Sequence, residues 1–180
     1  MIAVSRWLEE GGAQNDVVVW AVPFGDDWPR AWASCPRGDW LLAIAARAGT
    51  DPRKIVAAAC ACARFALEYL PDTEIRPRAA VDAAEGWVDG ADTPALRVQL
   101  AADVEAAIDA APDPAVAAAA TAALAALRSV ESTDDASFAV TSAVQAALLD
   151  AGDCALMSAM AYAHSVCVDL VREHVGVPEI

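Results

Sequence analysis

Apolar residues recur every three or four positions through most of this chain, the spacing that places them on one side of an α-helix. The pattern is clearest between Pro52 and Leu70. Two adjacent apolar stripes run along this stretch: Val56, Cys60, Ala63, Leu67 and Leu70 in the first, and Ile55, Ala59, Cys62, Ala66 and Tyr69 in the second. The opposite side carries Lys54, Arg64 and Glu68 among alanines. We therefore expect this segment to be buried over more than half of its circumference.

Proline and glycine mark the expected helix ends. Asp51, Thr93 and Asp113 each precede a proline, which combines a capping side chain with a residue suited to the first helical turn. Arg76 before Pro77 starts a further helix without a good cap. The pattern predicts seven main helices, at residues 38–48, 52–69, 77–89, 94–110, 114–129, 134–150 and 153–175, and two short ones at Ala3–Glu9 and Trp28–Ser34.

The segment Asp16–Val22 departs from this pattern, because its sequence DVVVWAV favours a β-strand. No partner strand can be identified, so an extended arm packed on the helices is expected. The sequence thus predicts an all-α fold, a compact multi-helix bundle of about seven main helices with an irregular, tryptophan-rich N-terminal arm. Residues 1–37 would form the arm and residues 38–180 the alanine-rich bundle, as a single domain overall.

Composition indicates the cellular compartment in which such a bundle is expected. Hydrophobic residues make up 57% of the chain and the mean hydropathy is +0.35, mostly because of alanine, the best helix former. The longest apolar run, Ala115–Leu127, is too short to cross a bilayer, and the N-terminus lacks the apolar core of a signal peptide. Five cysteines without a framework spacing fit reduced thiols. We expect a cytoplasmic protein that does not contact membranes.

The charge is strongly negative and uneven. The net charge of −14 divides into −4 for residues 1–90, with 9 basic and 13 acidic side chains, and −10 for residues 91–180, with 3 basic and 13 acidic. Such a surface repels nucleic acid and attracts basic partners. An acidic surface also serves solubility alone.

Residues that could carry catalysis or bind metal are few. Cys60 and Cys62 point about 200° apart on a helix, so both cannot reach one metal ion. On the last predicted helix, His164 lies in a stripe with Met157, Met160, Cys167 and Val171, which is more typical of a core than of a soft-metal site. Phosphate-binding loops and zinc-protease motifs do not occur. We expect no catalytic residues, no metal and no cofactor, hence no enzyme.

The tryptophans are concentrated near the N-terminus. Five of the six occur within the first 40 residues, at Trp7, Trp20, Trp28, Trp32 and Trp40. They suit a local core that fixes the arm, or anchors for a binding partner, since tryptophan is common at binding hot spots.

Two stretches together resemble a known family. WASCPRGDWLLAIAARAG, residues 32–49, contains Cys35, Asp39 and Trp40. CACARFALEYLPDTEIRPRAAVDAAEGWVDG, residues 60–90, contains Glu74, Arg76, Pro77, Arg78, Trp87 and Gly90. These residues, in this order, resemble the fifth numbered class of bacterial polymorphic-toxin immunity proteins. The resemblance implies an antitoxin that binds a bacterial toxin and neutralises it.

The residues of the second stretch can also be interpreted without the family resemblance. Asp82, Glu85 and Asp89 form an acidic stripe on the helix that starts at Pro77, and this stripe could bind a partner or simply face solvent. Arg76 and Arg78 could pair with Glu74, or with an acid on a neighbouring helix, and so stabilise the fold.

Three hypotheses of function follow. The first is an immunity protein that neutralises a basic toxin through its acidic surface. The second is a structural or adaptor module that assembles through the tryptophan-rich arm. The third is a small ligand-binding or enzymatic bundle with a pocket near His164 and Arg76.

Overall fold

A computed structural model describes residues 2–151 and 155–180, and in these ranges the fold is all-α, as predicted. Ten α-helices follow one another: α1 (Val4–Glu10), α2 (Asn15–Ala21), α3 (Trp28–Ser34), α4 (Gly38–Arg47), α5 (Pro52–Ala66), α6 (Arg76–Val88), α7 (Pro94–Asp109), α8 (Pro114–Arg128), α9 (Ala136–Asp150) and α10 (Leu156–His174). Three short 3₁₀ helices lie between them: η1 (Val22–Phe24), η2 (Leu67–Tyr69) and η3 (Thr133–Asp135).

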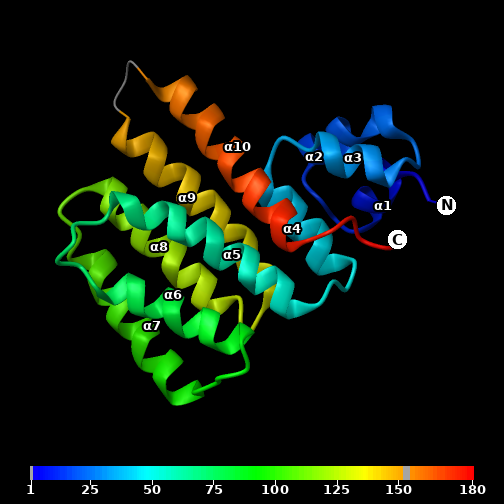
Figure 1. The fold of residues 1–180 in the computed structure, drawn as a ribbon. Coiled ribbons are helices and arrows are strands. Elements are labelled where there is room, and N and C mark those ends of the chain that lie inside the picture. Colours follow the sequence, from blue (N-terminus) through cyan, green and yellow to red (C-terminus); the bar gives the residue numbers. More distant parts are fainter. Residues whose placement is uncertain (1, 152–154) are drawn as a thin grey trace.

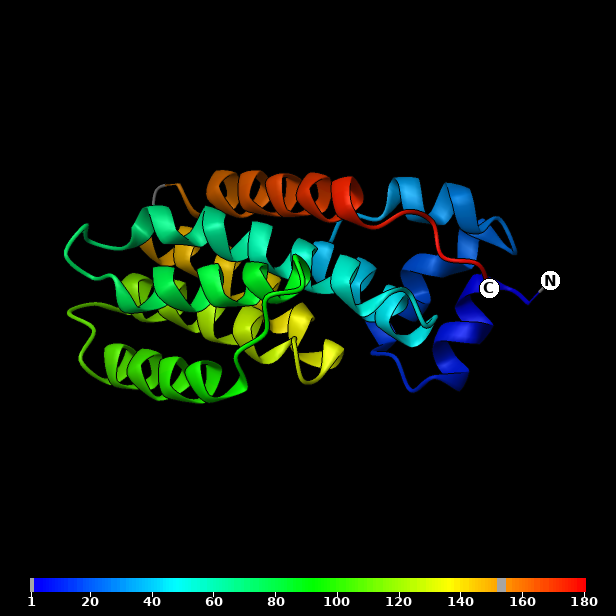
Figure 2. The same ribbon diagram turned by 60° about the horizontal axis from the view of Figure 1, so that its bottom comes forward.

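The long helices form a bundle with α5 and α8 in its middle (Figures 1 and 2). Helix α5 packs on α4, α6, α8, α9 and α10, and α8 packs on α5, α6, α7 and α9. Helices α7 and α10 lie at opposite edges of the bundle, as Figure 2 shows. The short helices α1–α3 gather at the end of the bundle beside α4, near both chain termini (Figure 1).

Alanine determines how closely the central helices approach. Eleven residues of α8 are buried, and eight of them are alanine. Because an alanine side chain is a single methyl group, α8 and α9 pack with little side-chain volume between them. The buried face of α5 matches the predicted stripes, except that Tyr69 is only partly buried.

The prediction of an extended segment at Asp16–Val22 is wrong, because these residues form α2 and the start of η1. Val17 and Ala21, four residues apart, are both buried on one side of α2. This packing outweighs the strand preference of valine, which amounts to less than about 1 kcal/mol per residue. Residues 2–37 therefore contain three short helices rather than an irregular arm, and two of these, α1 and α3, were expected. The described residues hold ten α-helices rather than the predicted seven main and two short ones.

The other helix boundaries differ from the prediction by a few residues. Helix α5 ends at Ala66 and continues as η2, while α9 begins at Ala136 after η3. The predicted start of the last helix, at residue 153, lies outside the described residues. In the described ranges, no helix combines the length and the apolar character needed to cross a bilayer.

Candidate functional site

The first family-motif stretch lies at a cleft of about 670 Å³ between the short N-terminal helices, α4 and the start of α9. The cleft is lined by residues of four segments: Trp7, Leu8, Gly11, Gly12, Ala13, Gln14 and Val17; Arg37, Asp39, Trp40, Ala43, Ile44 and Arg47; Asp134; and Ser137, Phe138 and Thr141. We refer to it as the tryptophan cleft. Its volume is within the range of small-ligand sites.

Asp39 and Trp40 are joined at this cleft by one arginine. The guanidinium of Arg37 donates from Nε and Nη2 to the two carboxylate oxygens of Asp39, at 3.1 and 2.6 Å. It also lies 4.7 Å from the ring centre of Trp40 and 3.6 Å from a carboxylate oxygen of Asp16. Asp39 is 9% exposed, so this bidentate pair satisfies a buried charge. The sequence motif includes Asp39 but does not single out Arg37, two residues earlier.

A second arginine is held beside the cleft by Trp7. Arg47 lies 4.1 Å from the ring centre of Trp7 and donates to the backbone oxygen of Leu8 at 3.4 Å. Its guanidinium passes directly over Gly11, where an added Cβ would overlap Nη1 at 0.9 Å. Glycine is therefore needed at position 11 for this stacked arrangement.

Cys35, the third motif residue of the first stretch, is structural. Cys35 is buried and its thiol donates to the backbone oxygen of Arg37 at 3.4 Å. Burial raises the pKa of this thiol to about 11, so it stays protonated and unreactive near neutral pH. Cys60 and Cys62 are also buried and free. Cys62 donates to the backbone oxygen of Cys167 at 3.8 Å, and burial raises the pKa of the Cys60 thiol to about 12.

His164 does not form the pocket with Arg76 that the third hypothesis requires. The imidazole of His164 is half-buried and its electrostatic neighbours are Asp39 and Arg37. Burial lowers its pKa, which keeps the ring neutral. Arg76 instead begins α6 and interacts electrostatically with Asp103 of α7, the helix at the opposite edge of the bundle from α10 (Figure 2). No cluster of three or more potential ligand side chains positioned for a metal ion occurs in the described ranges.

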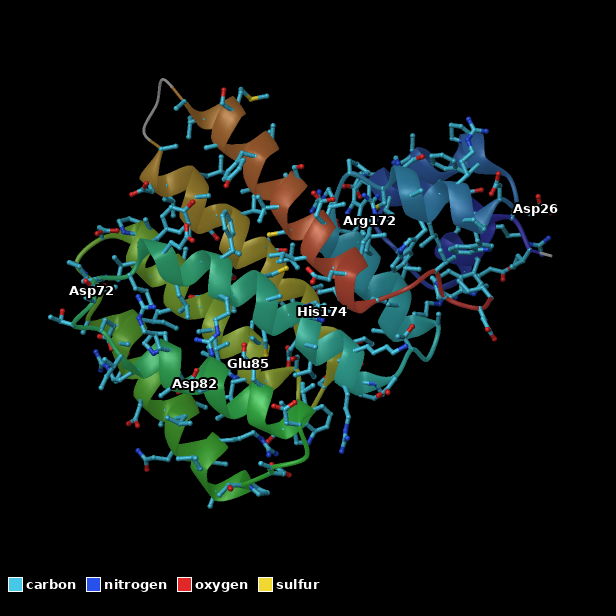
Figure 3. All side chains as sticks on the ribbon, viewed as in Figure 1. Asp26, Asp72, Asp82, Glu85, Arg172 and His174 are labelled. Carbon is cyan, nitrogen blue, oxygen red and sulfur yellow. The ribbon has the colours of Figure 1, made fainter. Side chains whose placement is uncertain are left out.

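The first motif residues of the second stretch, Glu74 and Arg76, lie far from the tryptophan cleft. They follow Asp72, which Figure 3 places at the end of the bundle away from the N-terminal helices. Arg76 donates to Glu74 from its backbone nitrogen and from Nε at 3.2 and 2.7 Å, which confirms the predicted pair and lowers the pKa of Glu74. Arg78 donates to the backbone oxygen of Leu67 at 3.2 Å, so it ties α6 to η2 rather than to an acid.

The rest of this stretch shapes α6 and its end. Pro77 is buried in the first turn. Gly90 has φ +92°, a conformation that glycine adopts without strain as the helix ends. Trp87 is partly buried, with Arg53 5.9 Å from its ring centre.

The acidic stripe of α6 is partly neutralised by an arginine that sequence reasoning did not connect with it. Arg64 of α5 donates to both carboxylate oxygens of Glu85, at 3.0 and 2.6 Å, and also pairs with Asp82 (Figure 3). Asp89 is exposed and lines, with Glu85 and His174, a hollow of about 270 Å³. The stripe thus presents three carboxylates against one guanidinium.

The arginines of residues 91–180 are all engaged within the protein. Arg97 pairs with Asp92 and Glu131, and Arg128 pairs with Glu105. Arg172 donates to three backbone oxygens at the end of α3, those of Trp32, Ala33 and Cys35, at 2.9, 2.7 and 3.0 Å (Figure 3). These contacts leave most carboxylates of this half without a basic partner among the described residues.

Comparison with known proteins gives no matching family model, no similar curated protein and no similar solved structure.

Proposed function

We propose that this protein is a non-catalytic immunity protein of the cytoplasm, which neutralises a basic toxin by binding it stoichiometrically. One observation carries the proposal: the three arginines of residues 91–180 contact acids or backbone oxygens of the protein itself. They are not available to compensate the remaining acids of this half, which carries a net charge of −10.

The exposed carboxylates are distributed over several helices. Among the described residues, no ion pair involves the following exposed acids: Asp89, Asp109, Asp134, Asp150, Asp169 and Glu173. Uncompensated charge of one sign speeds the encounter with a partner of the opposite sign. The same charge disfavours nucleic acid and anionic membranes. We assign the acidic stripe Asp82, Glu85 and Asp89 to this surface, with Asp89 as its member outside the Arg64 pairs.

The proposal is tested by identifying the partner and then measuring protection. The protein is purified from its own cells under native conditions, and complexes are identified by mass spectrometry. We expect a basic protein in a fixed stoichiometric ratio. Expression of that protein alone should arrest growth, and co-expression of this chain should restore it. A partner whose toxicity is unaffected by co-expression would contradict the immunity function.

Ligand binding in the tryptophan cleft is a second candidate function. The cleft volume of about 670 Å³ and the stacked guanidinium of Arg47 favour it. A small molecule that remains bound through native purification, and is lost from a Trp40→Ala variant, would support this function over the first.

A further inference from the structure

Apolar side chains are exposed where α9 ends and α10 begins. Met157 is 73% exposed and Tyr162 is 63% exposed on α10, with Leu156 at its first position and Leu149 near the end of α9 also exposed. Helices α5 and α9 both run toward this end of the bundle, and α10 runs away from it (Figures 1 and 2). The four residues therefore lie at one end of the molecule, with Met157 and Tyr162 about 140° apart around α10.

Two aromatic rings of the neighbouring segment extend this surface. The ring centre of Phe65 lies 6.1 Å from that of Tyr162 and 6.0 Å from that of Tyr69, both in edge-on contacts. Phe65 and Tyr69 are themselves only partly buried. We call the resulting surface the end patch; it consists of Phe65, Tyr69, Leu149, Leu156, Met157 and Tyr162.

The first half of α10 has little cover from the rest of the protein. Between Leu156 and Ser165, only Ala163 is buried. No aspartate, glutamate, lysine or arginine occurs from Ala155 to Val168, although the chain as a whole carries −14. Amphipathic helices of a monomer normally bury the apolar stripe and expose charges, and larger exposed apolar patches mark interaction surfaces.

Two acidic residues lie beside the Tyr69 end of this patch and favour a basic partner. Glu68 and Asp150 are both exposed and both lie close enough to contribute, after burial, to the raised pKa of Tyr69. No lysine or arginine occurs between Arg128 and Arg172 to balance them. A second copy of this chain would place acids against acids. A partner with an apolar centre and a basic rim would instead bury the patch and pair with its rim.

We propose that the end patch is the docking face for the basic partner of this protein. Apolar side chains of the partner cover Met157 and Tyr162, and its lysine or arginine side chains contact Glu68 and Asp150. The proposal rests on the proposed function, since it assumes a basic protein partner, and it places the hot spot on α10 rather than on the acidic stripe of α6.

A defined peptide tests the chemistry of this face. The probe is a synthetic amphipathic helix built from leucine and lysine, and the control is an alanine–lysine helix of equal length and charge. Of the three methionines, Met157 and Met160 lie on α10 and Met1 is at the start of the chain. With ¹³C-labelled methionine methyl groups, the leucine–lysine helix should shift the Met157 resonance and the alanine–lysine helix should not.

Substitutions then separate the end patch from the rest of the surface. Met157→Gln with Tyr162→Ser should weaken binding of the leucine–lysine helix at least tenfold. Glu68→Gln with Asp150→Asn should weaken it less and reduce its salt dependence. The matched control is Val98→Gln, since Val98 is an equally exposed apolar residue, at 67%, on α7 at the opposite edge. Circular dichroism checks that each variant is folded.

Each outcome decides the proposal. It is overturned if the Met157 methyl group does not respond to the leucine–lysine helix, or if Val98→Gln weakens binding as much as the Met157 and Tyr162 variant. Concentration-dependent dimers in sedimentation that Met157→Gln abolishes would assign the patch to a second copy instead. A basic partner that binds the patch variants with unchanged affinity leaves the proposed function standing and removes the end patch alone.

Discussion

Several arginines of this protein donate hydrogen bonds to its own backbone oxygens and carboxylates. Arg47 donates to a backbone oxygen near the end of α1, and Arg172 donates to three at the end of α3. The last turn of a helix has no partners of its own for these oxygens. Because α1 and α3 have only seven residues each, such contacts add to the packing of a few buried residues, two on α1 and three on α3.

Arg172→Ala should destabilise the protein by about 2 kcal/mol, in the range for hydrogen bonds to a charged donor. Arg172→Lys should recover only part of this loss, since an ammonium cannot reproduce the planar fork of the guanidinium. Urea denaturation followed by near-ultraviolet circular dichroism measures both. Arg6→Ala is the control, because Arg6 is exposed and its pair with Glu10 is worth little. Equal losses for the two alanine variants would contradict the assignment.

Buried thiols should make stability fall at alkaline pH. Burial raises the pKa of Cys35 to about 11 and of Cys60 to about 12, so the folded state holds both protons more tightly than the unfolded chain does. Their contribution is complete below about pH 8.5, the ordinary thiol pKa, and is lost as the pH rises toward the folded values. We expect each thiol to reduce stability by on the order of 1 kcal/mol between pH 9 and pH 10.

Urea denaturation of the wild type and of Cys60→Ala at pH 8, 9 and 10 checks this dependence. The variant should be less stable at pH 8 because of the cavity, yet its stability should fall less steeply with pH. An identical pH dependence in the two proteins would show that other groups cause the loss.

At the scale of single helices, contact distance decides where glycine is required. Gly38 begins α4, and an added Cβ there would lie 3.2 Å from backbone atoms of Cys167 and 3.3 Å from Val140. Gly86 lies inside α6, and its nearest neighbour would be the backbone oxygen of Ala91 at 3.5 Å. The first position is tight against the backbone of α10, whereas the second has ordinary space.

Alanine at these two positions should act in opposite directions. Gly38→Ala should cost about 1–3 kcal/mol because α10 must move away from α4. Gly86→Ala should stabilise the protein by about 0.5–1 kcal/mol, the usual advantage of alanine over glycine within a helix. Thermal denaturation of the two variants side by side measures this difference. A stabilised Gly38→Ala protein would mean that the α4–α10 contact is looser than described.

The sequence predicts an element well where the information is local, and poorly where contacts distant in sequence decide it. The starts of α5, α7 and α8 are predictable because a proline occupies the first position of each helix. Asp51 and Asp113 also cap α5 and α8 as predicted, whereas Thr93 makes no capping hydrogen bond. Helix α2 was not, since burial of Val17 and Ala21 depends on the fold around them. Likewise the Glu74–Arg76 pair spans two residues, whereas Arg64 meets Glu85 only because α5 and α6 pack together.

At the scale of the whole molecule, we expect the position of the negative charges to affect the rate of association with a basic partner more than the total charge does. Asp82→Asn, Glu85→Gln and Asp89→Asn together should slow association with a basic partner and weaken its dependence on salt, whose screening length falls from about 10 Å at 0.1 M to about 3 Å at 1 M. Stability should fall by less than about 1 kcal/mol, because the Arg64 pairs are partly exposed. Stopped-flow association rates at several salt concentrations measure the effect.

The control for this prediction changes the same charge elsewhere. Glu9→Gln, Asp26→Asn and Glu179→Gln remove three exposed acids outside the acidic stripe, and Figure 3 shows Asp26 among the N-terminal helices. If both triple variants slow association equally, only the total charge matters. If neither does, electrostatic attraction does not drive the encounter.

The contact between Arg172 and α3 also sets an order of events during synthesis. The backbone oxygen of Ala33 accepts its hydrogen bond from a side chain 139 residues later in the chain. At roughly 5–20 residues per second, a ribosome needs on the order of 10 s to make the intervening segment. Throughout that interval the nascent helix α3 lacks the hydrogen bonds that Arg172 donates to its last turn. The helices made first can therefore complete this contact only after α10, the last helix, has been made.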